Sequence, residues 1–179
     1  ENGLVEDVLR ECGKEASGRM LPLLQFTLTK LWENQVHREI SFRAYRTLGG
    51  LQKSLIQYGD EVWHSFDNDT NQQARLRHTM VQLVRPGIGT EDTRQIASYA
   101  DLEQYWDLVK VLADKRLVVT TGDASQQSVE LVHEALIGDW PKMQEWLKDD
   151  RAFRIWQNNT RVALADFQKA QDPGSLLRG

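Results

Sequence analysis

The 179 residues contain a single cysteine, Cys12. One cysteine cannot form an intramolecular disulfide or a cysteine-based zinc site, so we expect a reducing, cytoplasmic location. No apolar run approaches the roughly 18 residues of a membrane-spanning helix, and nothing at the N-terminus resembles a signal peptide. The net charge of −4 provides no excess of cations to attract nucleic acid or anionic lipid. These absences exclude a disulfide scaffold and disfavour membrane and DNA partners.

Motifs of several enzyme and metal-site classes are missing as well. The sequence has no G-x-x-x-x-G-K-[ST] phosphate loop, no G-x-G-x-x-G turn and no H-E-x-x-H pair. His133 and Glu134 begin like the zinc-protease motif, but Ile137 stands where its second histidine is required. The other histidines show no metal-ligand spacing: His37, His64 and His78. We therefore expect no catalytic residue and no metal ligand in this chain.

The residues that are present indicate a globular, mainly helical chain. It is 40% hydrophobic and 27% charged, which suits one ordinary domain or two small ones. Apolar residues at helical spacing predict helices near residues 4–9, 20–33 and 51–66. The chain lacks an initiating methionine and ends in DPGSLLRG, so we expect it to be a piece of a larger protein.

A second pattern begins at residue 69, where Asp69 or Thr70 can cap a helix. Helical spacing follows up to Val84, and Ser98 and Asp101 have capping-box spacing ahead of another helix that reaches Ala113. Short strands are predicted over TRQIA (93–97), LVVTT (117–121) and SVELV (128–132), the last two joined by the polar tip GDASQQ. Helix, strand, helix and β-hairpin is the order of a winged-helix domain.

The junction SVELVHEALIGDWP raises the question of function. It changes from strand to helix at His133, and Pro141 is expected to restart a helix. A helix N-terminus favours anions, and an imidazole N–H beside it can add a contact to a phosphate. The alternative is that His133 only caps the helix. Spacing alone leaves both interpretations open.

The winged-helix pattern makes DNA binding a hypothesis to test. The stretch equivalent to a recognition helix, residues 102–117, mixes acidic and basic side chains, and the GDASQQ tip has no basic residue. DNA binding requires clustered Lys and Arg. The sequence therefore disfavours DNA, unless five cations converge on one face of the fold: Arg75, Arg77, Arg85, Lys110 and Arg116.

Four stretches taken together, LPLLQFTLTKLWE, YRTLGGLQKSL, TEDTRQIA and VHEALIGDWPKMQEWL, resemble STAND-class (AP-ATPase-like) signalling NTPases. The resemblance is to the bacterial "novel STAND" group, whose chains often end in WD-type repeats. It covers the region after the nucleotide-binding core and implies a nucleotide-dependent switch in which a P-loop domain, a helical domain and a winged helix enclose ADP. Exchange for ATP with Mg²⁺ then promotes opening and oligomerisation.

The resemblance divides the chain into three parts. Residues 1–50 would complete the helical subdomain, 51–148 would hold a helix and the winged helix, and 149–179 would begin a connector helix towards repeats in cis. The P-loop ATPase domain would precede residue 1. We expect this fragment to be non-catalytic and to hold no nucleotide alone.

Two site residues follow from the resemblance. Pro22 matches a family proline that packs on the adenine, although Met20 replaces the glycine common two positions earlier. His133 matches a histidine that contacts the β-phosphate of ADP, with Glu134 in place of the usual aspartate.

The competing interpretation is a protein-interaction winged helix that binds a partner through tryptophans of the last helices: Trp140, Trp146 and Trp156. Tryptophans at helical spacing are more often part of a core. An exposed patch beside Pro22 and His133 would favour the missing ATPase domain, whereas one confined to the last helix would favour a separate partner.

Overall fold

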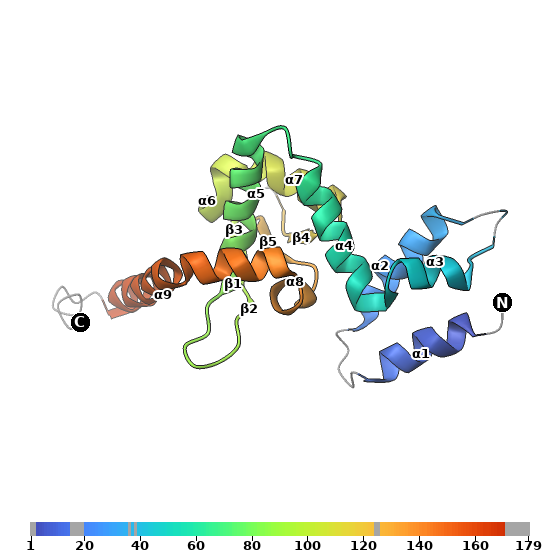
Figure 1. Ribbon diagram of the computed structural model, residues 1–179. Coiled ribbons are helices and arrows are strands. Elements are labelled where there is room, and N and C mark those ends of the chain that lie inside the picture. The colour runs from blue at the N-terminus through green and yellow to red at the C-terminus, as the bar shows by residue number, and fades with distance from the viewer. Residues whose placement is uncertain (1–2, 15–19, 36, 38, 124–125, 171–179) are drawn as a thin grey trace.

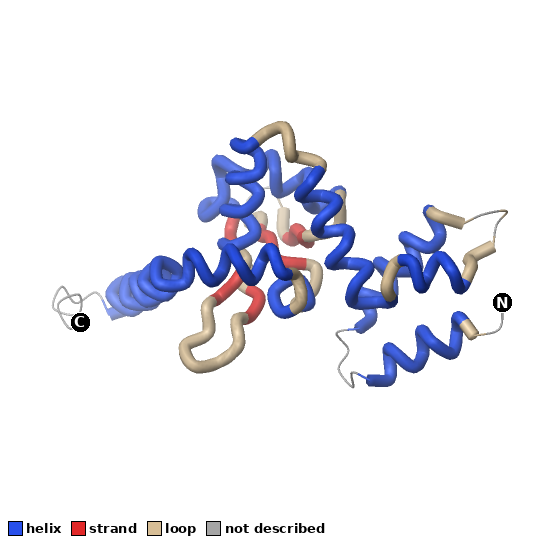
Figure 2. The backbone as a smooth tube through the Cα atoms, viewed as in Figure 1, coloured by secondary structure: helices blue, strands red, loops and turns tan. Residues whose placement is uncertain are grey.

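The computed structural model describes residues 3–14, 20–35, 37, 39–123 and 126–170, and all structural statements below concern these residues. The protein is mainly helical, with two small antiparallel sheets (Figures 1 and 2). The helices gather around one cluster of buried apolar side chains that runs from Leu23 to Leu147. None of the helices in this described part combines the length and apolar character that a bilayer-spanning segment needs.

The N-terminal helices form one end of the molecule (Figure 1). They are α1 (Leu4–Lys14), α2 (Met20–Glu33) and α3 (Phe42–Thr47), followed by α4 (Gly50–His64). α4 packs on α1, α2 and α3 and also on α8 (Ala135–Gly138), so it connects this end to the rest of the chain. The apolar stripe predicted over residues 51–66 explains the central position of α4. Leu51, Leu55 and Val62 of this helix are buried, whereas Phe66 lies just beyond its end.

Helix α5 (Thr70–Gln82) begins where the sequence predicts. Asp69 is its N-cap, and the carboxylate accepts a hydrogen bond from the Gln72 N–H at 3.0 Å. The helix ends before Val84, which the periodicity had included. Val84 instead belongs to strand β1 (Val84–Arg85), which pairs with β2 (Thr93–Arg94) around a seven-residue loop. Periodicity could not separate the two because Val84 is fully buried, and a buried apolar residue fits the pattern of a helix as well as that of a strand.

The second sheet contains the predicted β-hairpin. Strands β4 (Val118–Thr121) and β5 (Ser128–Leu131) pair antiparallel, which confirms the two strands expected there. The predicted strand 93–97 is divided: its start is β2, and only its last residue joins β3 (Ala97–Ser98), which pairs with the other edge of β5. The resulting strand order is β3-β5-β4.

The helical segment between β3 and β4 is interrupted. Ser98 and Asp101 form the predicted capping box, in which the Asp101 carboxylate accepts from the Ser98 N–H at 2.9 Å. The one helix expected up to Ala113 is instead α6 (Tyr99–Leu102), a 3₁₀ turn (Glu103–Tyr105) and α7 (Trp106–Asp114). The capping signal was therefore correct, but the length of the helix was not.

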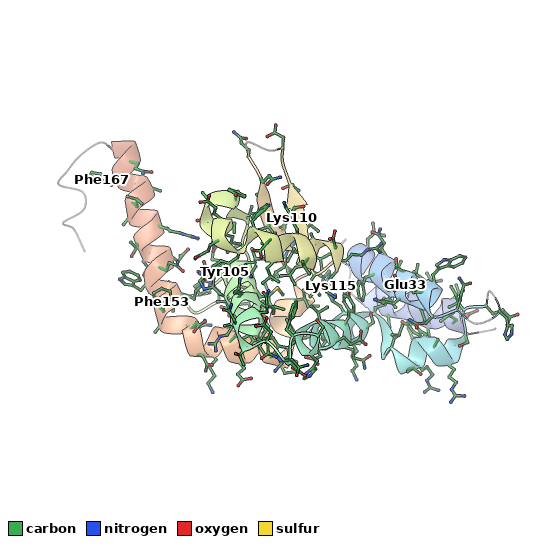
Figure 3. All side chains as sticks on the ribbon, turned by 90° about the horizontal axis from the view of Figure 1, so that it is seen from above. Glu33, Tyr105, Lys110, Lys115, Phe153 and Phe167 are labelled. Atoms are coloured by element: carbon green, nitrogen blue, oxygen red, sulfur yellow. The ribbon has the colours of Figure 1, made fainter. Side chains whose placement is uncertain are left out.

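The C-terminal part consists of the short α8 and the long helix α9 (Pro141–Ala170). Pro141 opens α9, which confirms the predicted restart. The domain boundary expected between residues 148 and 149 falls inside this continuous helix. α9 packs on α5 and α8, and its C-terminal end projects away from the body, with Phe167 near its far end (Figure 3).

Candidate functional site

His133 lies in the turn that joins β5 to α8. Its side chain is 7% exposed, and its Nδ1 atom accepts a hydrogen bond from the backbone N–H of Ala135 at 3.0 Å. In a neutral imidazole the nitrogen that accepts carries no hydrogen, so the ring hydrogen of His133 lies on Nε2. The sequence left open whether this histidine caps the helix or serves a ligand. The structure shows a local capping bond, which Nδ1 accepts from the Ala135 N–H.

The helix that follows His133 is shorter than the sequence suggested. α8 has only four residues, and one of its first N–H groups is already bonded to the His133 ring. The attraction of a helix N-terminus for anions comes from unpaired N–H groups and from aligned peptide dipoles. The N-terminus of α8 therefore contributes little to anion binding.

Glu134 makes an ion pair that fixes the turn. Its Oε1 lies 3.8 Å from the Nε of Arg94 on β2, and Arg94 also donates to the carbonyl of Leu131 at 3.2 Å. Arg94 is additionally close to the Glu130 carboxylate, at 3.4 Å. One arginine thus joins β2 to the end of β5 and to the residue after His133. Sequence patterns could not indicate Arg94, because strand β2 lies almost forty residues earlier in the chain.

His133 and Glu134 line a cleft of about 760 Å³ between the β1–β2 loop, α8 and α9. Four of its lining residues are acidic and two are basic, so with His133 neutral the lining carries a formal charge of −2. Such a surface does not attract a phosphate by itself. The lining residues are Glu91, Asp92, Thr93, His133, Glu134, Ala135, Ile137, Gly138, Asp139, Gln144, Leu147, Lys148 and Arg151.

A clamp between the β1–β2 loop and α9 shapes one wall of this cleft. Arg151 donates from Nη1 to both oxygens of Asp92 at 3.2 Å and from Nη2 to the Gly87 carbonyl at 2.6 Å. The Gly87 N–H in turn donates to Asp92 at 2.8 Å. A Cβ atom at Gly87 would lie 2.2 Å from the Thr90 carbonyl oxygen, so this position accepts only glycine without a backbone shift. Sequence patterns could not indicate this clamp, because Arg151 is far from Gly87 and Asp92 in the chain.

Pro22 lies in the first turn of α2, and its side chain is outside the described residues. Its neighbours one turn later, Gln25 and Phe26, line a pocket of about 340 Å³ together with β4 and Val132. Val132 precedes His133, but His133 itself lines the larger cleft. The structure therefore brings α2, the helix that carries Pro22, close to the segment that carries His133. Gln25 and Phe26 of α2 line one pocket, however, and His133 lines another.

Neighbouring side chains of α2 are unusually apolar for a surface. Leu21, Leu28 and Trp32 are exposed along one face of this helix, beside Pro22. Phe153 and Trp156 form a second exposed pair on α9, with ring centroids 5.8 Å apart (Figure 3). Patches of this kind mark surfaces that bind another domain or protein.

The competing hypotheses require exposed tryptophans on the last helices or basic side chains gathered on one face. Trp140 and Trp146 are buried, and only Trp156 is exposed. Arg75 pairs with Asp107 on α7, Arg77 with Asp149 and Asp150 on α9, and Arg116 donates to Thr29 on α2. In the described part of the chain, no group of three or more His, Cys, Asp or Glu residues is arranged to hold a metal ion.

Comparison with known proteins identifies one family. The family model described as novel STAND NTPase 1 matches residues 1–175, which is nearly the whole chain. No curated protein and no solved structure matches it.

Proposed function

Because the chain belongs to the novel STAND NTPase 1 family, we propose that it is the regulatory, non-catalytic region of a STAND ATPase. In this proposal, residues 1–179 close over ADP that is bound to a P-loop domain outside them, and exchange for ATP with Mg²⁺ opens the arrangement and allows oligomerisation in the cytoplasm. The absence of a G-x-x-x-x-G-K-[ST] loop from the sequence fits a division of labour in which the missing domain holds the phosphates.

We further propose that residues 70–131 form a winged helix within this region. Two observations support it: the order of elements, from α5 through β3, α6 and α7 to the β4–β5 hairpin, and the strand order β3-β5-β4. The short hairpin β1–β2 is an addition to the simple pattern. The separate surroundings of Arg75, Arg77 and Arg116 argue against DNA as the partner of this domain.

The observation that carries the nucleotide proposal is the hydrogen-bonding state of His133. Because Nδ1 accepts from the Ala135 N–H, the ring carries its hydrogen on Nε2, which is the donor that a phosphate oxygen requires. A bond to a charged oxygen contributes about 1.5–3 kcal/mol. If it forms only in the closed state, ADP shifts the equilibrium towards closure by roughly ten- to a hundredfold.

Pro22 would contribute the adenine contact. The family resemblance supports this role, and so does the pocket of about 340 Å³ that begins one turn after it. The exposed Leu21, Leu28 and Trp32 on the same helix fit a surface covered by the missing ATPase domain. The net negative charge of the cleft at His133 is compatible with the proposal only if that domain supplies the cations.

The experiment compares nucleotide content in a longer form of the protein that includes the P-loop domain. It is purified with native His133 and as His133→Ala, His133→Asn and His133→Gln. Asparagine can replace Nδ1 as the acceptor for the Ala135 N–H, whereas glutamine places an amide N–H near the position of Nε2. We expect ADP to co-purify with the native protein. The affinity for ADP should fall at least roughly tenfold in the alanine and asparagine forms and recover partly in the glutamine form.

Two results would contradict the proposal. If the asparagine form retains ADP as the native protein does, His133 is only the cap of α8. If ADP is absent from every form, the chain is not a nucleotide-dependent switch. Thermal unfolding of each form is the control, because loss of the Ala135 bond alone is expected to cost only about 1 kcal/mol.

A second candidate function is a protein-interaction module, and one observation favours it. Phe153 and Trp156 are exposed on α9, and Phe153 lies where this helix leaves the body of the protein (Figure 3). In the switch proposal, the same surface faces the repeats expected to follow in cis. A partner that binds isolated residues 1–179 and is lost on Trp156→Ala, with no nucleotide dependence in the longer protein, would favour the interaction module.

A further inference from the structure

Helix α4 begins without a cap of its own. Its N-cap is Gly49, which has φ 75° and no side chain to accept a hydrogen bond, and its first residue is Gly50 with φ 86°. A 15-residue helix presents unpaired N–H groups and the positive end of its dipole at this point. A side-chain oxygen from serine, threonine or aspartate usually satisfies them. The LGGL sequence provides none, so the acceptor must come from elsewhere.

The acceptor comes from α1. The Oε2 atom of Glu11 accepts a hydrogen bond from the Leu51 N–H at 2.9 Å, across 40 residues of sequence. Gly50 makes the approach possible, because a Cβ atom at this position would lie 2.7 Å from both carboxylate oxygens. Glu11 therefore occupies a space that Gly50 leaves open, and its negative charge lies at the positive end of α4.

A buried tyrosine completes the surroundings of this carboxylate. Tyr45 on α3 is 2% exposed, and its hydroxyl makes no hydrogen bond of normal geometry within the described residues. Burial raises the pKa of Tyr45 well above its usual value, and the nearby charge of Glu11 raises it further. The hydroxyl is therefore a neutral donor beside a carboxylate. A buried donor is costly unless an acceptor lies near it, and the Glu11 carboxylate is the anion beside this hydroxyl.

From this geometry we propose that the N-terminus of α4, Gly50 and the Tyr45 hydroxyl form a carboxylate-binding site whose resident ligand is Glu11. The site fastens α1 to the helical end of the molecule. Among the described side chains of α1, Leu4, Val8 and Cys12 pack against the core but are only partly buried, and Val5 and Leu9 are exposed. When α1 detaches, the vacated site accepts another carboxylate of similar size. This inference is independent of the nucleotide proposal.

The test uses Glu11→Ala, which empties the site, and acetate, which replaces the missing carboxylate. The backbone amide signal of Leu51 is followed by ¹⁵N–¹H NMR during a titration with sodium acetate, and sodium chloride at equal ionic strength is the control. We expect a saturable acetate-dependent shift at Leu51 in Glu11→Ala and none in the native protein. Adding Tyr45→Phe should weaken acetate binding at least several-fold, because the hydroxyl donor is lost.

Hydrogen exchange measures the fastening of α1 in the same samples. Residues 4–14 should exchange at least roughly tenfold faster in Glu11→Ala than in the native protein, with Glu11→Gln between the two because its amide oxygen can still accept. The Gln form also keeps the test valid if the alanine form does not fold. The proposal is wrong if acetate gives no saturable shift in Glu11→Ala, if Tyr45→Phe leaves acetate binding unchanged, or if Glu11→Gln exchanges residues 4–14 at the native rate.

Discussion

Replacing Trp140 by alanine is expected to reduce the free energy of unfolding by about 3–5 kcal/mol, because the substitution leaves a large cavity in a close-packed region. Trp140 is 0% exposed and precedes α9. Its ring contacts that of Trp146 edge-to-face, with centroids 5.3 Å apart, and the backbone of α4 approaches it at Gly59. The loss is a large part of the stability of an ordinary domain, which is roughly 5–15 kcal/mol.

Trp156→Ala is the matched control for this prediction. The chemical change is the same, but Trp156 is 62% exposed, so its loss is expected to cost less than about 1 kcal/mol. Urea denaturation followed by circular dichroism at 222 nm measures both variants without relying on tryptophan fluorescence. Equal destabilisation by the two substitutions would show that Trp140 is not part of the core in solution.

Trp140→Phe separates packing from hydrogen bonding. The indole N–H of Trp140 donates to the Asp60 carboxylate at 2.7 Å and so joins the start of α9 to α4. Phenylalanine retains most of the apolar volume but leaves Asp60 without this donor. We expect the free energy of unfolding of Trp140→Phe to lie between that of the native protein and that of Trp140→Ala, because a hydrogen bond to a charged group contributes about 1.5–3 kcal/mol.

Replacing Arg154 by alanine is expected to lower the free energy of unfolding by about 3 kcal/mol, because the buried acceptors that it serves lose their donor. Arg154 is only 4% exposed, and its guanidinium donates to the Gln82 side chain and to the Val84 carbonyl, each at 2.7 Å. It also bonds to Gln157. These contacts join α9 to the end of α5 and to β1. Burial, followed by the neighbouring charge of Arg161, lowers the pKa of Arg154, with Asp150 opposing them.

Two variants test whether the guanidinium is needed for its shape or only for its charge. Arg154→Lys retains the charge, but a single ammonium cannot serve both acceptors as the planar fork does, so we expect little recovery of stability. Arg161→Ala removes a more exposed arginine that pairs with Asp101 at 2.8 Å, and we expect a loss of at most about 1 kcal/mol. Full recovery by lysine would indicate that charge alone holds α9 to α5.

Local signals in the sequence predicted the beginnings of elements well. The Asp69 cap, the Ser98–Asp101 capping box and the restart at Pro141 are all present in the structure. Each depends on a few consecutive residues whose side chains complete hydrogen bonds at a helix end, so the signal and its effect lie in the same short stretch. The two strands of the β4–β5 hairpin were predictable for the same reason.

The ends of elements were less predictable, because tertiary contacts decide them. Val84 continues the apolar pattern of α5, but pairing with Arg94 of β2 places it in a strand. The helix expected up to Ala113 is divided by the 3₁₀ turn at residues 103–105. Periodicity counts buried positions, and a buried side chain satisfies it equally well in a helix or in a strand.

The same distinction applies to the candidate sites. The sequence by itself indicated the family, the composition that disfavours DNA and the strand-to-helix junction that carries His133, since each of these is a property of consecutive residues. Only the tertiary structure decided which nitrogen of His133 accepts, that Arg94 pairs with Glu134, and that Glu11 caps α4 beside Tyr45. The contacts of Arg94 with Glu134 and of Glu11 with Leu51 join residues that are far apart in sequence, and only the packing of strands and helices brings them together.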